Sequence, residues 1–159
     1  MNLTRLSSVI VLRGKPNSGK TAILNSLCDA IINSPAVQVN PKEQEPSRTN
    51  KGDQRASAVY KHRKVAICTA GDDANCIVKA FRYAEKVNAE VLVMALSIHK
   101  KGYKTAELAF EGIVAHKQLT KLVDDSIETT YAPPKPKNYV DNVKVQALLS
   151  KVGSIRRRA

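Results

Sequence analysis

The segment Ser8–Thr21, with the sequence SVIVLRGKPNSGKT, decides the fold of this chain. Its first five residues, Ser8–Leu12, are mostly β-branched and apolar, as expected for a short buried strand. Its last two residues open the segment Lys20–Asn33, whose apolar side chains recur on one helical face at Ile23, Leu24, Leu27 and Ile31. A loop that begins and ends with glycine separates the two. We therefore expect a strand, a glycine-rich loop and a helix in direct succession.

The loop matches the pattern G-x-x-x-x-G-K-[ST] over its whole length, Gly14-Lys15-Pro16-Asn17-Ser18-Gly19-Lys20-Thr21. Glycines allow backbone N–H groups to converge on an anion without obstruction from Cβ atoms. The helix that begins near Lys20 adds the positive end of its dipole. Lys20 supplies a positive charge for the β- and γ-phosphates, and the Thr21 hydroxyl can bind Mg²⁺. These eight residues are therefore predicted to bind a nucleoside triphosphate.

On this motif the chain resembles the P-loop NTPase superfamily, and its size is similar to that of the compact nucleotide-kinase-like and GTPase-like members. The resemblance covers most of the chain, and the phosphate loop is its one sharp motif. It implies a three-layer α/β/α fold with a mostly parallel sheet. It also implies binding of ATP or GTP together with Mg²⁺, and we expect ATP rather than GTP.

Beyond the loop, the apolar pattern alternates between strand and helix. The expected elements are strands at Ala56–Tyr60 and Lys64–Thr69 around a tight turn at His62–Arg63, a helix at Ala74–Asn88, a strand at Glu90–Ala95, a helix at Thr105–Leu119, a strand at Ile127–Tyr131 and a helix at Tyr139–Ile155. This order predicts an α/β fold with about five strands, mostly parallel and covered by helices on both faces.

The length of 159 residues suits a single domain over residues 1–159. Residues 33–54 are polar and rich in proline, so we expect a flexible insertion there, with one short strand at Val37–Val39. Residues 132–138 form a proline-rich break before a basic C-terminal helix. No apolar run approaches the ~20 residues of a membrane-spanning helix. The three cysteines form no C-x-x-C pair, and a cytoplasmic location is expected.

A second nucleotide motif is expected at the end of another strand, where the family normally holds Mg²⁺ through an Asp. The segment Thr69-Ala70-Gly71-Asp72-Asp73 is similar to the D-T-A-G turn of GTPases, but Cys68 stands in the place of the Asp. One hypothesis assigns metal binding to Asp72, and catalysis to Asp72 with Asp73. The alternative is that either carboxylate caps the following helix. The other apolar strand, Val91–Ser97, carries no acid.

Two further strings bear on the nucleotide. Lys100, Lys101 and Lys104 follow the strand that ends at Ser97, and that end should lie near the phosphate loop in a parallel sheet. The segment resembles the lid of a nucleotide kinase, which brings cations onto the transferred phosphate, although a solvated connection is the alternative. The string Asn50–Asp53 (NKGD) matches the guanine-reading N-K-x-D pattern, but it precedes the D-T-A-G-like turn, whereas in GTPases it follows it.

The chain is strongly basic, with 26 Lys and Arg against 14 Asp and Glu and a net charge of +12. The excess lies in residues 42–64, 98–104 and 133–159, and it favours polyanionic partners. Our first hypothesis is a Mg²⁺-dependent NTPase or kinase-like phosphotransferase in which Lys20 and Asp72 carry the chemistry. The alternative is a low-turnover nucleotide-binding regulatory module that docks to nucleic acid or a larger complex through its basic loops and tail.

Overall fold

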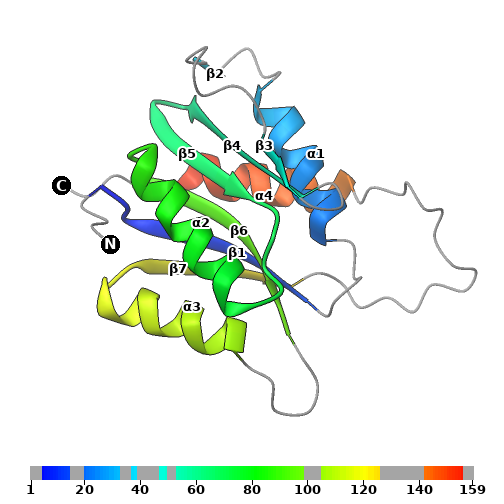
Figure 1. The fold of residues 1–159 in the computed structure, drawn as a ribbon. Coiled ribbons are helices and arrows are strands. Elements are labelled where there is room, and N and C mark those ends of the chain that lie inside the picture. Colours follow the sequence, from blue (N-terminus) through cyan, green and yellow to red (C-terminus); the bar gives the residue numbers. More distant parts are fainter. Residues whose placement is uncertain are drawn as a thin grey trace, which may run out of the picture.

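The structure, a computed structural model, describes residues 5–14, 20–32, 37–38, 47–49, 53–98, 105–125 and 142–155. It is an α/β fold in which strands and helices alternate along much of the chain (Figure 1). The strands are β1 (Ser8–Gly14), β2 (Val37–Gln38), β3 (Ser47–Thr49), β4 (Asp53–Tyr60), β5 (Arg63–Cys68), β6 (Val91–Ser97) and β7 (Thr120–Asp125). The helices are α1 (Lys20–Ile32), α2 (Ala74–Lys86), α3 (Thr105–His116) and α4 (Asn142–Ser154).

The strands of the described segments form one sheet in the order β2-β4-β5-β6-β1-β7, with β3 also paired to β4. β5, β6, β1 and β7 run parallel, whereas β4 is antiparallel to β5. Five longer strands and two very short ones therefore make the mostly parallel sheet that the sequence predicts. β6 lies between β5 and β1, although it follows both of them in the sequence.

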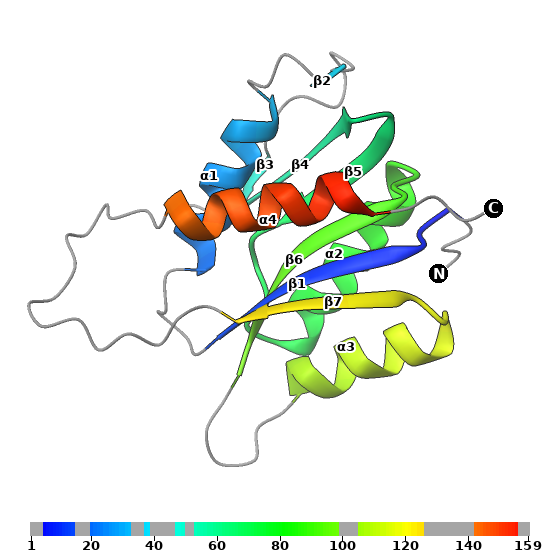
Figure 2. The ribbon, with the colours of Figure 1, turned by 180° about the vertical axis from the view of Figure 1, so that it is seen from behind.

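Helices cover both faces of this sheet, α1 and α4 on one and α2 and α3 on the other (Figures 1 and 2). The central strand β1 is buried on both sides because its residues alternate between the two cores. Ile10 and Leu12 enter the core below α1 and α4, and Val9 and Val11 enter the opposite core. This two-sided burial explains why β1 and β6 are continuous apolar runs.

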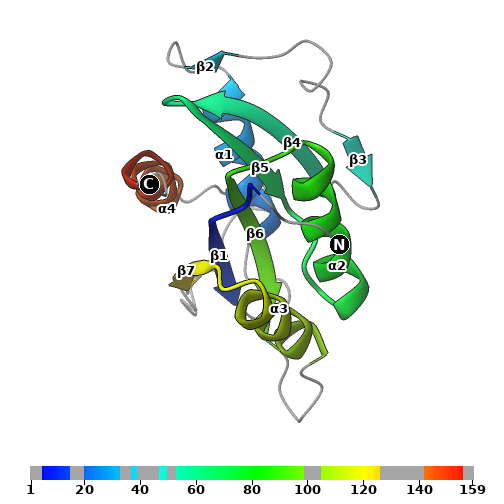
Figure 3. The same cartoon turned by 90° about the vertical axis from the view of Figure 1, so that its left-hand side faces the viewer.

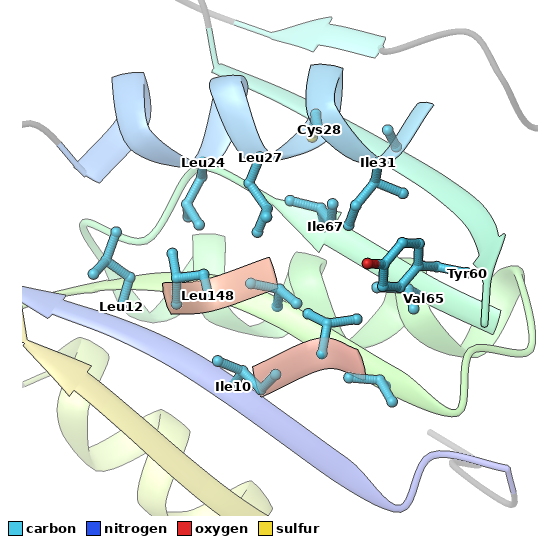
Figure 4. Packing of buried hydrophobic residues seen from close by; sticks show 14 of the residues in the cluster. Ile10, Leu12, Leu24, Leu27, Cys28, Ile31, Tyr60, Val65, Ile67 and Leu148 are labelled. Atoms are coloured by element: carbon cyan, nitrogen blue, oxygen red, sulfur yellow. The ribbon is translucent and has the colours of Figure 1, made fainter. Parts of the chain in front are cut away.

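Each core is completed by helix side chains. In the first core, Leu24 and Leu27 of α1 and Leu148 of α4 surround the strand residues (Figure 4). In the second, the rings of Phe81 in α2 and Phe110 in α3 lie with their centroids 6.2 Å apart and are fully buried. With 4% aromatic residues in the chain, these two phenylalanines are the largest fully buried side chains in the described segments.

The helices α2 and α3 are each followed by a residue with a positive φ angle. For α3, this residue ends the helix earlier than the sequence predicts. α2 ends before Asn88, which has a φ of 56°, and the Ala89 N–H donates to the Ala84 carbonyl at 2.9 Å. α3 ends at His116 in place of the expected Leu119, because Gln118 takes a φ of 53° and the Leu119 N–H donates back to Val114 at 3.0 Å. Asn is a common residue in this left-handed position, but Gln carries no such signal.

Other boundaries differ from the sequence expectation by a few residues. The β4–β5 turn lies at Lys61–His62 and not at His62–Arg63, since Tyr60 pairs with Arg63. The strand β7 at Thr120–Asp125 was not expected, and the expected strand Ile127–Tyr131 lies outside the described residues. No helix in the described ranges is long and apolar enough to cross a membrane.

Replacing Leu148 by Ala tests the contribution of α4 to the fold. Leu148 is fully buried, so its truncation removes apolar contacts and leaves a cavity, and we expect the free energy of unfolding to fall by about 2–5 kcal/mol. Leu108→Ala is a matched control, because Leu108 also lies in a helix but is 71% exposed, and its replacement should cost less than about 0.5 kcal/mol. Urea unfolding followed by circular dichroism measures both. Equal losses would contradict the docking of α4.

Candidate functional site

The carboxyl ends of β1, β5 and β6 meet at one edge of the sheet. Gly14 at the end of β1 is in register with Ser97 at the end of β6. The Ser97 N–H donates to the carbonyl of Gly71, in the turn after β5, and the Ile98 N–H donates to the Gly14 carbonyl, both at 2.9 Å. Backbone hydrogen bonds therefore fix the starts of three loops against one another. α1 also begins at this edge (Figure 2).

Lys20, the first residue of α1, turns back toward β1. Its ammonium donates to the Gly14 carbonyl at 3.1 Å, and the residue is 5% exposed. The Gly14 carbonyl thus accepts hydrogen bonds from both Ile98 and Lys20. Burial lowers the pKa of Lys20 because it disfavours the charged form, while the carboxylate of Asp72 acts in the opposite direction. The low solvent access strengthens the attraction of this cation for an anion.

Asp72 brings a carboxylate from the turn after β5 to the end of β6. Its Oδ1 accepts a hydrogen bond from the Ser97 hydroxyl. Ser97 is fully buried whereas Asp72 is exposed, so a fixed hydroxyl orients a carboxylate that solvent can reach. Because Asp72 also interacts electrostatically with Lys20, a buried cation and an oriented anion are coupled across the end of β6.

Gly71 allows Asp72 to reach this position. A Cβ atom on Gly71 would lie 2.0 Å from the carbonyl oxygen and 2.5 Å from the carbonyl carbon of Ala95, in the backbone of β6. Such distances are far below van der Waals contact, and a strand backbone cannot yield in the way that a flexible side chain can. The turn therefore packs directly on β6 because residue 71 lacks a side chain.

Asp73 has a different role from its neighbour. It is the N-cap of α2, with extended φ and ψ angles of −142° and 172°, and its Oδ1 accepts the Cys76 N–H at 2.8 Å. This hydrogen bond to the ionised form holds the pKa of Asp73 below its usual value. Of the two alternatives left open by the sequence, Asp73 is thus found in the capping position, whereas Asp72 lies beside Ser97.

Cys68 ends β5 at the position where the GTPase turn would have its Asp. Burial raises the pKa of this thiol to about 12, so it is neutral and carries no charge to the site. Thr21, one residue after Lys20 in the first turn of α1, is partly exposed. Lys15, Pro16, Asn17, Ser18 and Gly19 of the loop lie outside the described residues, as do Lys100, Lys101 and Lys104 of the expected lid.

The arrangement is suited to an anion that carries a divalent cation. The charge of Lys20 and the N–H groups in the first turn of α1 favour a phosphate. The carboxylate of Asp72 and the hydroxyl of Thr21 are oxygen donors of the kind that Mg²⁺ prefers, and Mg²⁺ generally uses one or two protein ligands together with phosphates and water. In the described part of the chain, no group of three or more His, Cys, Asp or Glu comes together.

In comparisons with known proteins, no family model, no curated protein and no solved structure matches this chain. The chemistry of the site is therefore argued from its own residues.

The sequence did not predict two features of this site, the hydrogen bond of Ser97 to Asp72 and the contact of Gly71 with β6. Ser97 is the polar end of an otherwise apolar strand, and this polar terminus was the available signal, but its hydrogen bond to Asp72 joins residues 25 positions apart. Gly71 was visible as part of the D-T-A-G-like turn. The reason for the glycine, close contact with β6, depends on a strand that comes 20 residues later in the chain.

Gly71→Ala should disrupt the approach of the turn to β6. We expect the free energy of unfolding to fall by about 2 kcal/mol or more, because the new methyl group overlaps backbone atoms. The matched control is Gly112→Ala in α3, where a Cβ meets nothing within 4 Å and the helix should gain about 0.5–1 kcal/mol. Thermal melting of the two variants measures the contrast. A Gly71→Ala protein as stable as its parent would contradict the close contact.

Asp73→Ala should remove the cap of α2 and lower the free energy of unfolding by about 0.5–2 kcal/mol at neutral pH. Because the pKa of Asp73 is lower in the folded than in the unfolded chain, its contribution is complete above the ordinary carboxyl pKa of about 4 and is lost as the pH falls through the folded value. Asp73→Asn keeps a capping oxygen that does not titrate. In urea unfolding measured from pH 7 to pH 2, the loss in free energy of unfolding caused by Asp73→Ala should become smaller as the pH falls. A loss that does not change with pH would exclude the ionised cap.

Proposed function

We propose that this protein binds a nucleoside triphosphate with Mg²⁺ and catalyses hydrolysis or transfer of its γ-phosphoryl group. The observation that carries the proposal is the buried ammonium of Lys20, which lies in the first turn of α1, is held by the Gly14 carbonyl and is coupled to Asp72. The Gly14 carbonyl and the carboxylate of Asp72 hold this cation at the start of α1. A phosphate bound there would place further negative charge beside it.

The parallel arrangement of β1, β5, β6 and β7 with helices on both faces supports assignment of the chain to the three-layer P-loop fold. In such sheets ligands bind at the carboxyl ends of the strands. Gly14, Lys20, Asp72 and Ser97 all lie at that edge. The loop residues 15–19 then connect a buried strand to the N-terminus of α1, which is the connection that the phosphate-binding motif requires.

The proposed roles follow from the chemistry of each side chain. The loop amides and Lys20 bind the phosphate oxygens, and Lys20 offsets negative charge that develops on the β- and γ-phosphates in the transition state. Thr21 and Asp72 would hold Mg²⁺, which when bound neutralises phosphate charge and aligns the phosphate oxygens. Ser97 keeps Asp72 in one orientation through its hydrogen bond. Asp73 stabilises α2 and does not enter the chemistry.

ATP is the proposed nucleotide. In the chain order the NKGD string precedes the turn at Gly71, and its Asp53 begins β4, which β5 and β6 separate from β1. Guanine recognition through this string is therefore not part of the proposal. The phosphoryl acceptor is left open between water and a second substrate, and the lysines of the proposed lid, Lys100, Lys101 and Lys104, would contact the transferred group.

One observation favours the alternative, a nucleotide-binding module with little turnover. The thiol of Cys68 is neutral at the strand end where the family has a carboxylate. The acid that remains, Asp72, comes four residues later and is held by Ser97. If Asp72 positions neither the metal nor the nucleophile, the protein would bind ATP with Mg²⁺ and release γ-phosphate slowly.

Titration with a fluorescent ATP analogue and assay of phosphate release separate these alternatives. Lys20→Met retains the buried apolar stem but removes the charge, and we expect the affinity for Mg²⁺-ATP to fall by at least tenfold. Asp72→Asn should retain binding but lose most of the phosphate release. The matched control is Lys64→Ala, because Lys64 also has a pKa lowered by burial but lies at the start of β5, on the opposite edge of the sheet.

Each outcome has a distinct meaning. Folded protein with no saturable binding of either ATP or GTP would contradict the proposed function altogether. Saturable, Mg²⁺-dependent binding without loss of γ-phosphate, to water or to an added acceptor, would support the low-turnover module. A loss of affinity in Lys64→Ala equal to that in Lys20→Met would show that general charge, and not the site at Gly14, attracts the nucleotide.

A further inference from the structure

A second charged surface lies at the edge of the sheet opposite to the proposed nucleotide site. The turn between β4 and β5 carries four consecutive basic residues, Lys61-His62-Arg63-Lys64. Lys61 and His62 are exposed at its tip. Figure 3 looks onto this edge and shows the turn and the C-terminal end of α4 on the same side of the molecule. We call the four basic residues 61–64, together with Lys151 of α4, the basic turn surface.

The backbone of the turn is unfavourable for the residues that it carries. Lys61 has a φ of 47° and His62 a φ of 66°, so both central residues of this two-residue hairpin turn are left-handed. Such turns strongly prefer Asn-Gly, because other side chains are strained at positive φ. Unfavourable backbone of this kind tends to persist where the side chains have a function. Here the sequence places two basic side chains where stability alone would favour Asn and Gly.

Contacts with neighbouring elements hold the turn in place. The Lys61 ammonium lies 5.6 Å from the centre of the Tyr60 ring. It also lies close to α4, since a Cβ on Gly153 would be 3.0 Å from it. Lys151 is in the last turn of the same helix. Ile155, the last described residue, is buried, with 7% of its surface exposed. In the sequence, three arginines follow it.

The usual explanation for basic residues at this edge covers only part of the surface. The C-termini of the helices lie here, and Lys86 and Lys151 in their last turns complement the negative ends of the helix dipoles. The Lys61 ammonium lies near Gly153 in the last turn of α4, so it also complements that dipole. His62, exposed at the tip of the hairpin turn, belongs to no helix.

We propose that the basic turn surface docks the phosphate backbone of duplex nucleic acid without reading its sequence. The exposed large hydrophobic side chains of the described ranges are Leu108 and Val123, and neither is on this surface, whereas membrane-binding surfaces add apolar anchors to their charge. Tyr60 is buried, with 6% of its surface exposed, so it offers no platform for the base stacking that contributes to single-strand binding. Charge without apolar or stacking groups matches the densely charged duplex backbone.

The proposal does not depend on the nucleotide site. The two surfaces lie at opposite ends of the parallel strands, so a protein that binds no ATP could still dock nucleic acid, and the reverse is also possible. If both proposals hold, the nucleic acid would lie at one end of the sheet and the triphosphate at the other.

The test uses a variant that removes charge and relieves the turn at the same time. Lys61→Asn combined with His62→Gly introduces the pair that this turn prefers, so the melting temperature should be unchanged or raised. Affinity for a fluorescein-labelled 25-base-pair random-sequence DNA, measured by anisotropy with the full chain, should fall roughly eightfold at 0.1 M salt, and the slope of log K against log salt should decrease by about one. Lys79→Asn is the control, since it removes one exposed lysine from the middle of α2.

The outcomes decide the matter. Support requires a weaker and less salt-dependent duplex affinity in the turn variant, a change of less than twofold in Lys79→Asn, and parental binding of Mg²⁺-ATP by the turn variant if the parent binds it. Parental duplex affinity and slope in the turn variant would overturn the proposal. Loss of binding to phosphatidylserine vesicles with duplex binding unchanged would also overturn it, in favour of a membrane.

Discussion

The candidate site depends on the last register pair between β1 and β6. Gly14 and Ser97 end their strands side by side, and the Gly14 carbonyl accepts both the Ile98 N–H and the Lys20 ammonium. A shift of one residue would turn every side chain of β6 to the other face of the sheet. Because all seven residues of β6 are buried and its apolar residues are divided between the two cores, such a shift would force both cores to repack. The packing of the cores therefore also fixes the geometry of the site.

Two neighbouring carboxylates are separated in function by the backbone between strand and helix. Asp73 lies in extended conformation before α2 and directs its oxygen to the first turn of the helix. Successive side chains of extended backbone point in opposite directions, so Asp72 is directed elsewhere, toward Ser97. The missing side chain of Gly71 brings this turn onto the β6 backbone. One short segment thus caps a helix and supplies a carboxylate to the sheet edge.

The two ends of the sheet differ in their electrostatics. At the carboxyl ends of the parallel strands, α1 presents its N-terminus and Lys20 is buried, which favours one small, multiply charged anion in a desolvated place. At the amino ends, Lys61 and His62 are exposed to solvent, which favours an extended polyanion whose binding is screened by salt. We therefore propose two kinds of anion for this chain of net charge +12, a triphosphate at one end of the sheet and nucleic acid at the other.

Much of this molecule could be predicted from the sequence because the signals are local. The strand Ser8–Leu12, the start of α1 at Lys20 and the start of α2 at Ala74 follow from apolar period, glycine placement and a capping Asp. The α/β class of the fold followed from the alternation of these elements, whereas phosphate binding by the octapeptide Gly14–Thr21 stays a prediction.

The tertiary structure decided what depends on residues far apart in the chain. Strand order is one case, since β6 lies between β5 and β1 and brings Ser97 to Asp72. The end of α3 is another, because Gln118 takes a left-handed conformation without the residue type that would announce it. The same holds for the turn at Lys61–His62, whose position is set by the pairing of Tyr60 with Arg63. Local sequence sets period and preferred dihedral angles, whereas partners and register are chosen by which faces bury the most apolar surface together.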